Sequence, residues 1–379
     1  MNKKSYLYKI YQSIVKVLKT PSFRYILIGL IMLYLAFNLS GGKKDAIIST
    51  AIYFIVGLGF TLLLGYAGLA SLGTAGFMAI GVYLFGILND RDLYGLPAPL
   101  VFIIILGIGL VLGLVIGFIS LRIEGIFLAI VTLGLSEIVV EIMKNLARML
   151  TGVERCTIST SALWFGDQNI PIYADGIKYL TIFLMIVVMI LIANIMKSAT
   201  GRAMLSLKNS QSAGQMMGMS LLKYRLSAFV ISTILASLGG ILFMSYYHYT
   251  EPIDWGLTTS LLILAAVVIG GAKSIIGVLL GTVAVFTINT LFLQQITFFR
   301  ENSNFINIFT GILIIVIVMF FPGGLYHLGL ILKMKFIDLK KKIVEKLNKS
   351  KLERKEQYYG KDEEYRPFET ISYWKKKNF

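Results

Sequence analysis

The chain has 379 residues, of which 56% are hydrophobic and only 15% are charged, and its formal net charge is +16. Its apolar runs are longer than the core helices of a soluble protein need to be, which excludes an ordinary soluble enzyme and predicts an all-α polytopic membrane protein. One cysteine and two distant histidines offer no disulfide and no convincing metal site, and we expect no catalytic residue and no cofactor.

The positive charge is concentrated in three segments. Residues 1–24 carry +6, residues 197–225 carry +5 and residues 333–379 carry +7, while the rest of the chain is slightly acidic. Because basic segments stay on the cytoplasmic side of a membrane, orientation explains this charge and nucleic acid need not be invoked. We therefore expect a multi-pass protein of the cell membrane with both termini in the cytoplasm.

Apolar runs of about 16 to 24 residues predict about ten membrane-spanning helices. These spans lie at 25–40, 46–64, 66–88, 97–120, 125–143, 177–196, 226–247, 257–272, 275–298 and 303–321. The predicted organisation is a basic cytoplasmic N-terminus at 1–24, a transmembrane domain at 25–325 with a cytoplasmic loop at 197–225, and a basic tail at 326–379. Spans two to five and seven to ten would run in opposite senses, which suggests an inverted repeat.

Two glycine-rich stretches, 65–81 and 270–281, adjoin turn-like breaks in the spans. Glycines inside spans most often permit close helix packing, but broken helices are also common near the substrate path of transporters. Almost no hydrophilic loop separates spans two and three, and a broken or re-entrant element there would be tolerated only where protein or a water-filled path covers it.

Two acids, Glu137 and Glu141, stand four residues apart on one face of the fifth predicted span. An ionisable group in a span is a functional-site hypothesis, because leaving it in lipid is costly. Lining of a pathway and simple solvation near the membrane surface, with help from Lys144, both remain open. The predicted pathway residues are Gly68, Ser71, Gly73, Thr132, Glu137, Gly270 and Gly271.

Four segments together resemble a known family. They read GYAGLASLGTAGFMAIGVYL at 65–84, EGIFLAIVTLGLSEI at 124–138, GRAMLSLKNSQSAGQMMGMSLLKYRLSAFVISTILASLGGILF at 201–243 and VVIGGAKSIIGVLLG at 267–281. In this order and at this spacing they resemble the permease subunits of branched-chain amino acid ABC importers, of the LivM type. The similarity covers roughly residues 46 to 325.

The resemblance implies that the basic loop at 197–225 is a coupling helix, which docks into an ATP-binding subunit. Small residues permit a close helix turn in this loop, and its methionines offer soft apolar contact to a partner's groove. The family's acidic start is replaced by polar residues here, and an ordinary positive-inside loop is the alternative interpretation. The predicted coupling residues are Arg202, Ser210, Gln211, Ala213 and Gly218.

The resemblance also implies the partners: two ATP-binding subunits, a second homologous permease and an extracellular substrate-binding protein. No phosphate-binding loop of the form G-x-x-x-x-G-K-[ST] occurs, so ATP hydrolysis is expected in a separate chain. The basic tail would contact membrane lipid through an amphipathic helix, or extend into solvent. The expected cargo is a branched-chain or related amino acid. Importers of urea, nucleosides or simple sugars, and an ion-coupled secondary transporter, are the alternatives.

Overall fold

The computed structural model describes residues 21–39, 41–90, 93–120, 123, 125–157 and 174–287, together with isolated positions between 311 and 345. The chain divides into two compact units, Met1–Tyr326 and His327–Phe379. In the described part, helices make up almost all of the regular structure, which confirms the predicted all-α membrane architecture. Among the residues that the structure describes, four helices are long and apolar enough to cross a membrane, at Gly42–Tyr66, Ala98–Ile119, Gly176–Lys197 and Leu221–Tyr247.

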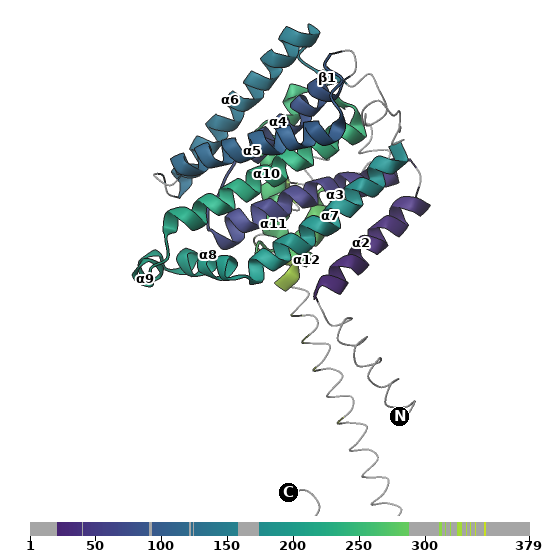
Figure 1. Cartoon of the computed structure of the whole chain (residues 1–379). Helices are drawn as coiled ribbons and strands as arrows, with labels where there is room; N and C mark the ends of the chain where they lie inside the picture. The colour runs from purple at the N-terminus through teal and green to yellow at the C-terminus, as the bar shows by residue number, and fades with distance from the viewer. Residues whose placement is uncertain are drawn as a thin grey trace, which may run out of the picture. The chain divides into compact units, whose positions relative to one another are not determined.

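The described elements follow one another along the first unit as in Figure 1. They are α2 (Pro21–Asn38), α3 (Gly42–Phe60), η1 (Thr61–Tyr66, a π-helix), α4 (Thr74–Asn89), α5 (Ala98–Ser120), α6 (Ile126–Thr151), β1 (Cys156–Thr157), α7 (Ala174–Lys197), α8 (Ala199–Asn209), α9 (Gln211–Met216), α10 (Leu221–Tyr247), β2 (Tyr249–Thr250), η2 (Pro252–Trp255, a 3₁₀ helix), α11 (Leu257–Gly270), α12 (Ile275–Thr282) and η3 (Val283–Thr287, a π-helix).

Helix α10 is central and packs against α3, α4 and α5 (Figure 1). The α4–α10 contact is close because both helices present glycine. A β carbon on Gly81 would lie 2.1 Å from the carbonyl oxygen of Ser237, and one on Gly240 would lie 2.1 Å from the carbonyl oxygen of Met78. Lipid offers no hydrophobic drive for helix association, so such backbone-to-backbone approach contributes much of the packing. Almost every residue of α4 is buried as a result.

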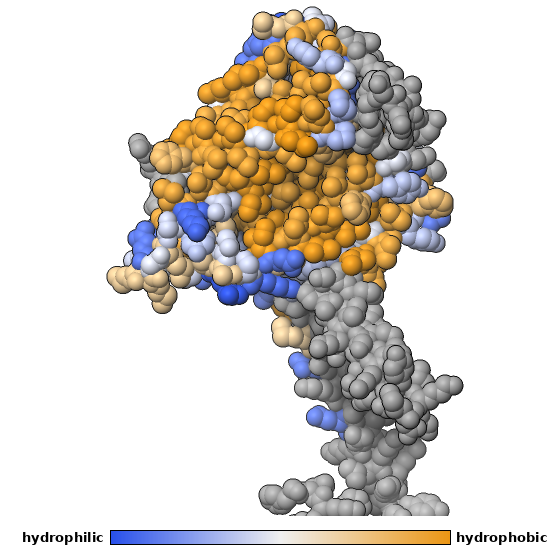
Figure 2. All heavy atoms as spheres, viewed as in Figure 1, coloured by the Kyte–Doolittle hydropathy of each residue, from blue (hydrophilic) through white to orange (hydrophobic). Residues whose placement is uncertain are grey.

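The two ends of the unit differ in structure. At one end, β1 and β2 pair antiparallel, with Cys156 opposite Thr250 and Thr157 opposite Tyr249, which joins the C-terminal ends of α6 and α10. At the N-terminal end of α10 lie α8 and α9 (Figure 1). Figure 2 shows a broad apolar surface between polar residues at the two ends, as a membrane protein requires.

The helices depart from the predicted spans at three places. The third span, predicted at 66–88, begins only at Thr74 because the chain is not helical from 67 to 73. The fifth, predicted to end at 143, continues as α6 to Thr151, where Gly152 ends it in the left-handed conformation (φ 76°). The structure describes the ninth predicted span, 275–298, only as far as Thr287, and most of the tenth, 303–321, lies outside the described residues. The suggested inverted repeat stays a prediction.

Candidate functional site

Three serines divide the basic loop at 197–225 into separate helical pieces. Ser198 begins α8, Ser210 begins α9 and Ser220 begins α10, and each hydroxyl accepts a hydrogen bond from the backbone N–H three residues later at 3.4 Å. Serine is a preferred N-cap because its oxygen satisfies an amide that the helix leaves without a partner. The loop therefore contains two short helices, α8 and α9, at the end of the transmembrane bundle.

Helix α8 is anchored to the bundle on one face. Ala203, Met204 and Leu207 are buried, and Leu207 also touches Gly214 of α9 so closely that a β carbon there would lie 2.6 Å from the Leu207 Cδ2 atom. The other face is exposed and includes Arg202, whose guanidinium donates a hydrogen bond to the carbonyl oxygen of Lys197 at 2.7 Å.

Helix α9 is the most exposed part of the loop. Gln211 and Ala213 are exposed on it, and Met216 and Met217 are 87% and 76% exposed. Gly218 ends the helix with φ 77°, a left-handed conformation that glycine adopts without strain. Among the predicted coupling residues, Ser210, Gln211, Ala213 and Gly218 thus lie on or beside α9, whereas Arg202 lies on α8.

A contact that the sequence did not predict joins α8 to the transmembrane helices. The ammonium of Lys208 donates hydrogen bonds to the backbone carbonyl oxygens of Leu64 at 2.7 Å and Gly65 at 3.0 Å, at the end of η1. A β carbon on Gly68, where φ is 74°, would lie 3.0 Å from the Lys208 Cγ atom. The pKa of Lys208 is lowered, chiefly by partial burial and to a smaller extent by the positive charge of the neighbouring Lys273.

The interruption between η1 and α4, at residues 67–73, is held by side chains from other helices. Thr132 of α6 accepts a hydrogen bond from the Leu72 N–H at 3.0 Å, Ser136 of α6 accepts one from Gly76 at 3.1 Å, and Ser260 of α11 accepts one from Ala75 at 3.0 Å. The hydroxyls of Ser136 and Ser260 satisfy two of the first amides of α4, which the helix itself cannot pair, and Thr132 satisfies an amide just before it.

This interruption lies inside the bundle. Ser136 stands ten residues beyond the start of α6, about 15 Å along its axis, so α4 begins near the middle of a span. Non-helical backbone at such depth is tolerated only where protein or a water-filled path covers it. The structure has a broken element between spans two and three, where the sequence offers almost no hydrophilic loop.

The predicted pathway residues fall into three places. Gly68, Ser71, Gly73 and Thr132 gather at the interruption, where Ser71 and Thr132 are buried and a β carbon on Gly73 would lie 2.5 Å from the Thr132 carbonyl oxygen. Gly270 and Gly271 lie where α11 turns into α12, and Glu137 lies apart from both groups on the exposed face of α6.

The turn between α11 and α12 touches the interruption. A β carbon on Gly65 would lie 1.9 Å from the carbonyl oxygen of Ala272, so only glycine fits at this approach. Gly271 has φ 100°, another conformation that favours glycine. A cavity of about 410 Å³ opens beside the turn and is lined by both Lys208 and Lys273.

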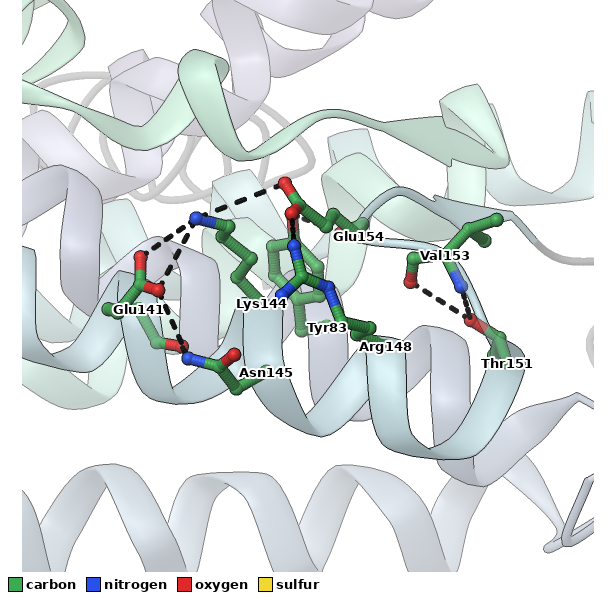
Figure 3. Close-up of polar contacts among 8 residues, drawn as sticks. All are labelled: Tyr83, Glu141, Lys144, Asn145, Arg148, Thr151, Val153 and Glu154. Atoms are coloured by element: carbon green, nitrogen blue, oxygen red, sulfur yellow. Dashed lines mark hydrogen bonds and ion pairs between the residues drawn. The ribbon is translucent and has the colours of Figure 1, made fainter.

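The two acids of α6 differ in their surroundings. Glu141 accepts a hydrogen bond from the Lys144 ammonium at 3.0 Å, and Lys144 and Arg148 both contact Glu154 beyond the end of α6 (Figure 3). Glu137 is exposed one turn earlier and makes no hydrogen bond or ion pair with any residue that the structure describes. The expected help of Lys144 is therefore present for Glu141.

Metal chemistry finds no support in the described part of the chain. No group of three or more His, Cys, Asp or Glu side chains there could hold a metal ion. Cys156 is buried in β1, within contact distance of Gly86.

Comparisons with known proteins agree with this geometry. A family profile described as "Branched-chain amino acid transport system / permease component" matches residues 44–318. The high-affinity branched-chain amino acid transport system permease proteins LivM of Salmonella typhimurium and Escherichia coli are each 30% identical to this chain. The match to the Salmonella typhimurium protein spans 76% of this chain and 71% of the relative. The match to the Escherichia coli protein spans 79% of this chain and 74% of the relative.

A third relative, described as a probable ABC transporter permease protein of Sinorhizobium fredii, is 27% identical over 56% of this chain and 62% of its own length. No solved structure matches this chain.

Proposed function

The chain belongs to the permease family of branched-chain amino acid ABC importers, and we propose that it forms one wall of an amino acid pathway that partner ATPases open and close. It would work with two ATP-binding subunits, a second homologous permease and an extracellular substrate-binding protein. Alternating access would move the substrate: closure of the ATPases displaces the docking helices, and the path between the two permeases opens to the other side.

The exposed end of α9 is the observation that carries this proposal. Two methionines there, Met216 and Met217, are 87% and 76% exposed at the end of the bundle where the basic loop lies. Methionine is unbranched and polarisable, and it adapts to an apolar groove on a partner. A short helix that presents such side chains suits an ATPase that must grip the permease throughout its cycle.

The charges of the loop support its placement in the cytoplasm. Residues 197–225 contain five basic residues and no acid, and such segments stay inside. The opposite end of the bundle, where β1 pairs with β2, would then face the binding protein outside the cell. Both termini would lie in the cytoplasm, with the basic tail at 326–379 near anionic lipid.

The pathway is proposed to run beside the interruption at 67–73 and along the exposed face of α6. Gly68, Ser71, Gly73 and Thr132 surround the interruption, and an opening there would expose backbone groups to a passing substrate. Glu137, exposed in the middle of α6, would face water in the path between two permeases instead of lipid. Gly270 and Gly271 would form the adjoining hinge.

The proposed cargo is leucine, isoleucine, valine or a related amino acid. The names of the two LivM relatives support this proposal, and selectivity in such importers would reside chiefly in the binding protein. Urea, nucleosides and simple sugars are the competing substrates.

Transport into proteoliposomes tests the proposal. The chain is co-expressed with a second permease, the ATPases and a binding protein, reconstituted, and supplied with radiolabelled leucine, valine, urea, adenosine or ribose. ATP-dependent uptake of the amino acids alone is the expected result. Uptake of urea, adenosine or ribose instead would show that the proposed cargo is wrong. Uptake driven by an ion gradient without any ATPase would overturn the whole proposal.

A further inference from the structure

We infer that Lys208 is a positioning residue that transmits movement of the α8–α9 docking element to the interruption between α3 and α4. The inference rests on the proposed function, because it assigns a part to this lysine in the coupling of ATP hydrolysis to transport. Neither the identity of the substrate nor the docking of α9 depends on it.

The first observation is the pair of hydrogen bonds from Lys208. Its ammonium lies 2.7 Å and 3.0 Å from the carbonyl oxygens of Leu64 and Gly65, which end the helix formed by α3 and η1. The last carbonyls of a helix lack partners within it and carry a partial negative charge, so a cation there is favourable. The positive charge of α8 thus replaces the hydrogen bonds that a continuous helix would make.

The second observation is the packing beneath the same helix. Met204 and Leu207 of α8 surround, together with Ala67 and Tyr224, a cavity of only about 10 Å³. Ala67 is the first residue after η1 and is itself buried. Closely packed interiors transmit displacement rather than absorb it. A shift of α8 would therefore push on the interruption through Ala67 and pull on it through Lys208.

The third observation is what the interruption touches on its far side. Gly65 approaches the backbone of Ala272 in the turn between α11 and α12 too closely for any side chain. The two glycine-rich stretches predicted from the sequence therefore meet at Gly65, whose carbonyl oxygen accepts a hydrogen bond from Lys208. A displacement delivered at Gly65 reaches the α11–α12 turn directly, and Thr132, Ser136 and Ser260 extend the connection to α6 and α11.

The ammonium of Lys208 is repelled by Lys273, which lines the same 410 Å³ cavity and is also positive. An isosteric apolar side chain should keep the packing of the stem and lose only the link to the carbonyls. Lys208→Met is such a change, while Lys208→Arg keeps the charge and the N–H donors.

The experiment measures transport and ATP hydrolysis in the same proteoliposomes. The full complex is prepared with wild-type permease, Lys208→Met, Lys208→Arg and the control Lys223→Met, which alters another exposed lysine of the same loop at the start of α10. We expect Lys208→Met to assemble and to hydrolyse ATP at close to the wild-type rate, but to transport about tenfold less substrate per ATP, since two charge-assisted hydrogen bonds are lost. Lys208→Arg should recover much of the ratio, and Lys223→Met should equal the wild type.

A wild-type ratio of transport to hydrolysis in Lys208→Met would overturn the inference. So would a parallel loss of assembly and ATP hydrolysis, because that would make Lys208 a docking residue. If Lys208→Met is not inserted into the membrane, Lys208→Gln takes its place, because its amide keeps an NH2 donor group but lacks the positive charge. We then expect a ratio of transport to hydrolysis between those of Lys208→Met and the wild type, and a wild-type ratio would refute the inference. Failure of the wild-type complex to transport at all would instead refute the proposed function.

Discussion

Replacing both exposed methionines of α9 by alanine should weaken docking of the ATP-binding subunit without disturbing the fold. Met216 and Met217 contribute nothing to the core of the permease, so the double variant should insert and unfold like the wild type. Their contribution to docking would come from the apolar surface that the ATP-binding subunit covers.

The magnitude follows from their exposure. Complete burial of a methionine side chain stabilises by about 2 kcal/mol, so covering side chains that are 87% and 76% exposed is worth about 3 kcal/mol together. That sum corresponds to a factor of about 200 in Kd. Alanine keeps the β carbon and docking covers only part of each side chain, so we expect Kd to rise by about 30-fold.

Binding of the purified ATP-binding subunit to the detergent-solubilised permease measures this change. Met149 is the matched control, because it is 84% exposed at the opposite end of the unit, where no ATPase should bind. Met149→Ala should leave Kd within about twofold of the wild type. Equal affinity of the α9 double variant and the wild type would refute the assignment of α9 as the docking helix.

Three further outcomes are expected. Gly218→Val should abolish substrate-stimulated ATP hydrolysis, whereas Gly218→Asn should keep most of it, because asparagine tolerates the left-handed backbone far better than valine does. Equal loss of hydrolysis in both variants would show that backbone strain is not the cause. Glu137→Gln should leave ATP-driven transport independent of any ion gradient, as uptake assays at varied external pH would verify, whereas arrest of transport would favour ion coupling. Gly81→Ala should destabilise the folded permease by about 1 to 3 kcal/mol, because the added methyl group clashes with Ser237. Gly107→Ala should not destabilise it, because a β carbon there meets open space. Thermal unfolding in detergent compares the two variants, and equal melting temperatures would contradict the α4–α10 packing.

The sequence predicts the spans well where hydrophobicity alone determines them. Span four at 97–120 corresponds closely to α5, and span seven at 226–247 ends at the same residue as α10. It also predicts the break near Gly65 to Gly68, because glycines crowd there with almost no hydrophilic residue. These features depend on composition within a short window, which a single sequence contains.

Features that depend on contacts between distant residues could not be predicted in this way. The link from Lys208 to Leu64 joins residues 144 positions apart, and a lysine in a basic loop carries no sign of it. The late start of α4 depends on hydroxyls supplied by α6 and α11. The polar extension of α6 to Thr151 was missed because Lys144 and Arg148 look like the end of a span, although they pair with Glu154 beyond it.

The small pairing of β1 with β2 limits how this permease can open at that end. Cys156 and Thr157 are bonded to Tyr249 and Thr250, and the indole N–H of Trp255, itself buried, donates to the Thr250 hydroxyl at 2.7 Å. The ends of α6 and α10 cannot part without breaking these bonds. If this chain pairs with a second permease as proposed, a passage at that end would widen by tilting of this subunit as a rigid body, with the movement taken up at α8, α9 and the interruption at 67–73.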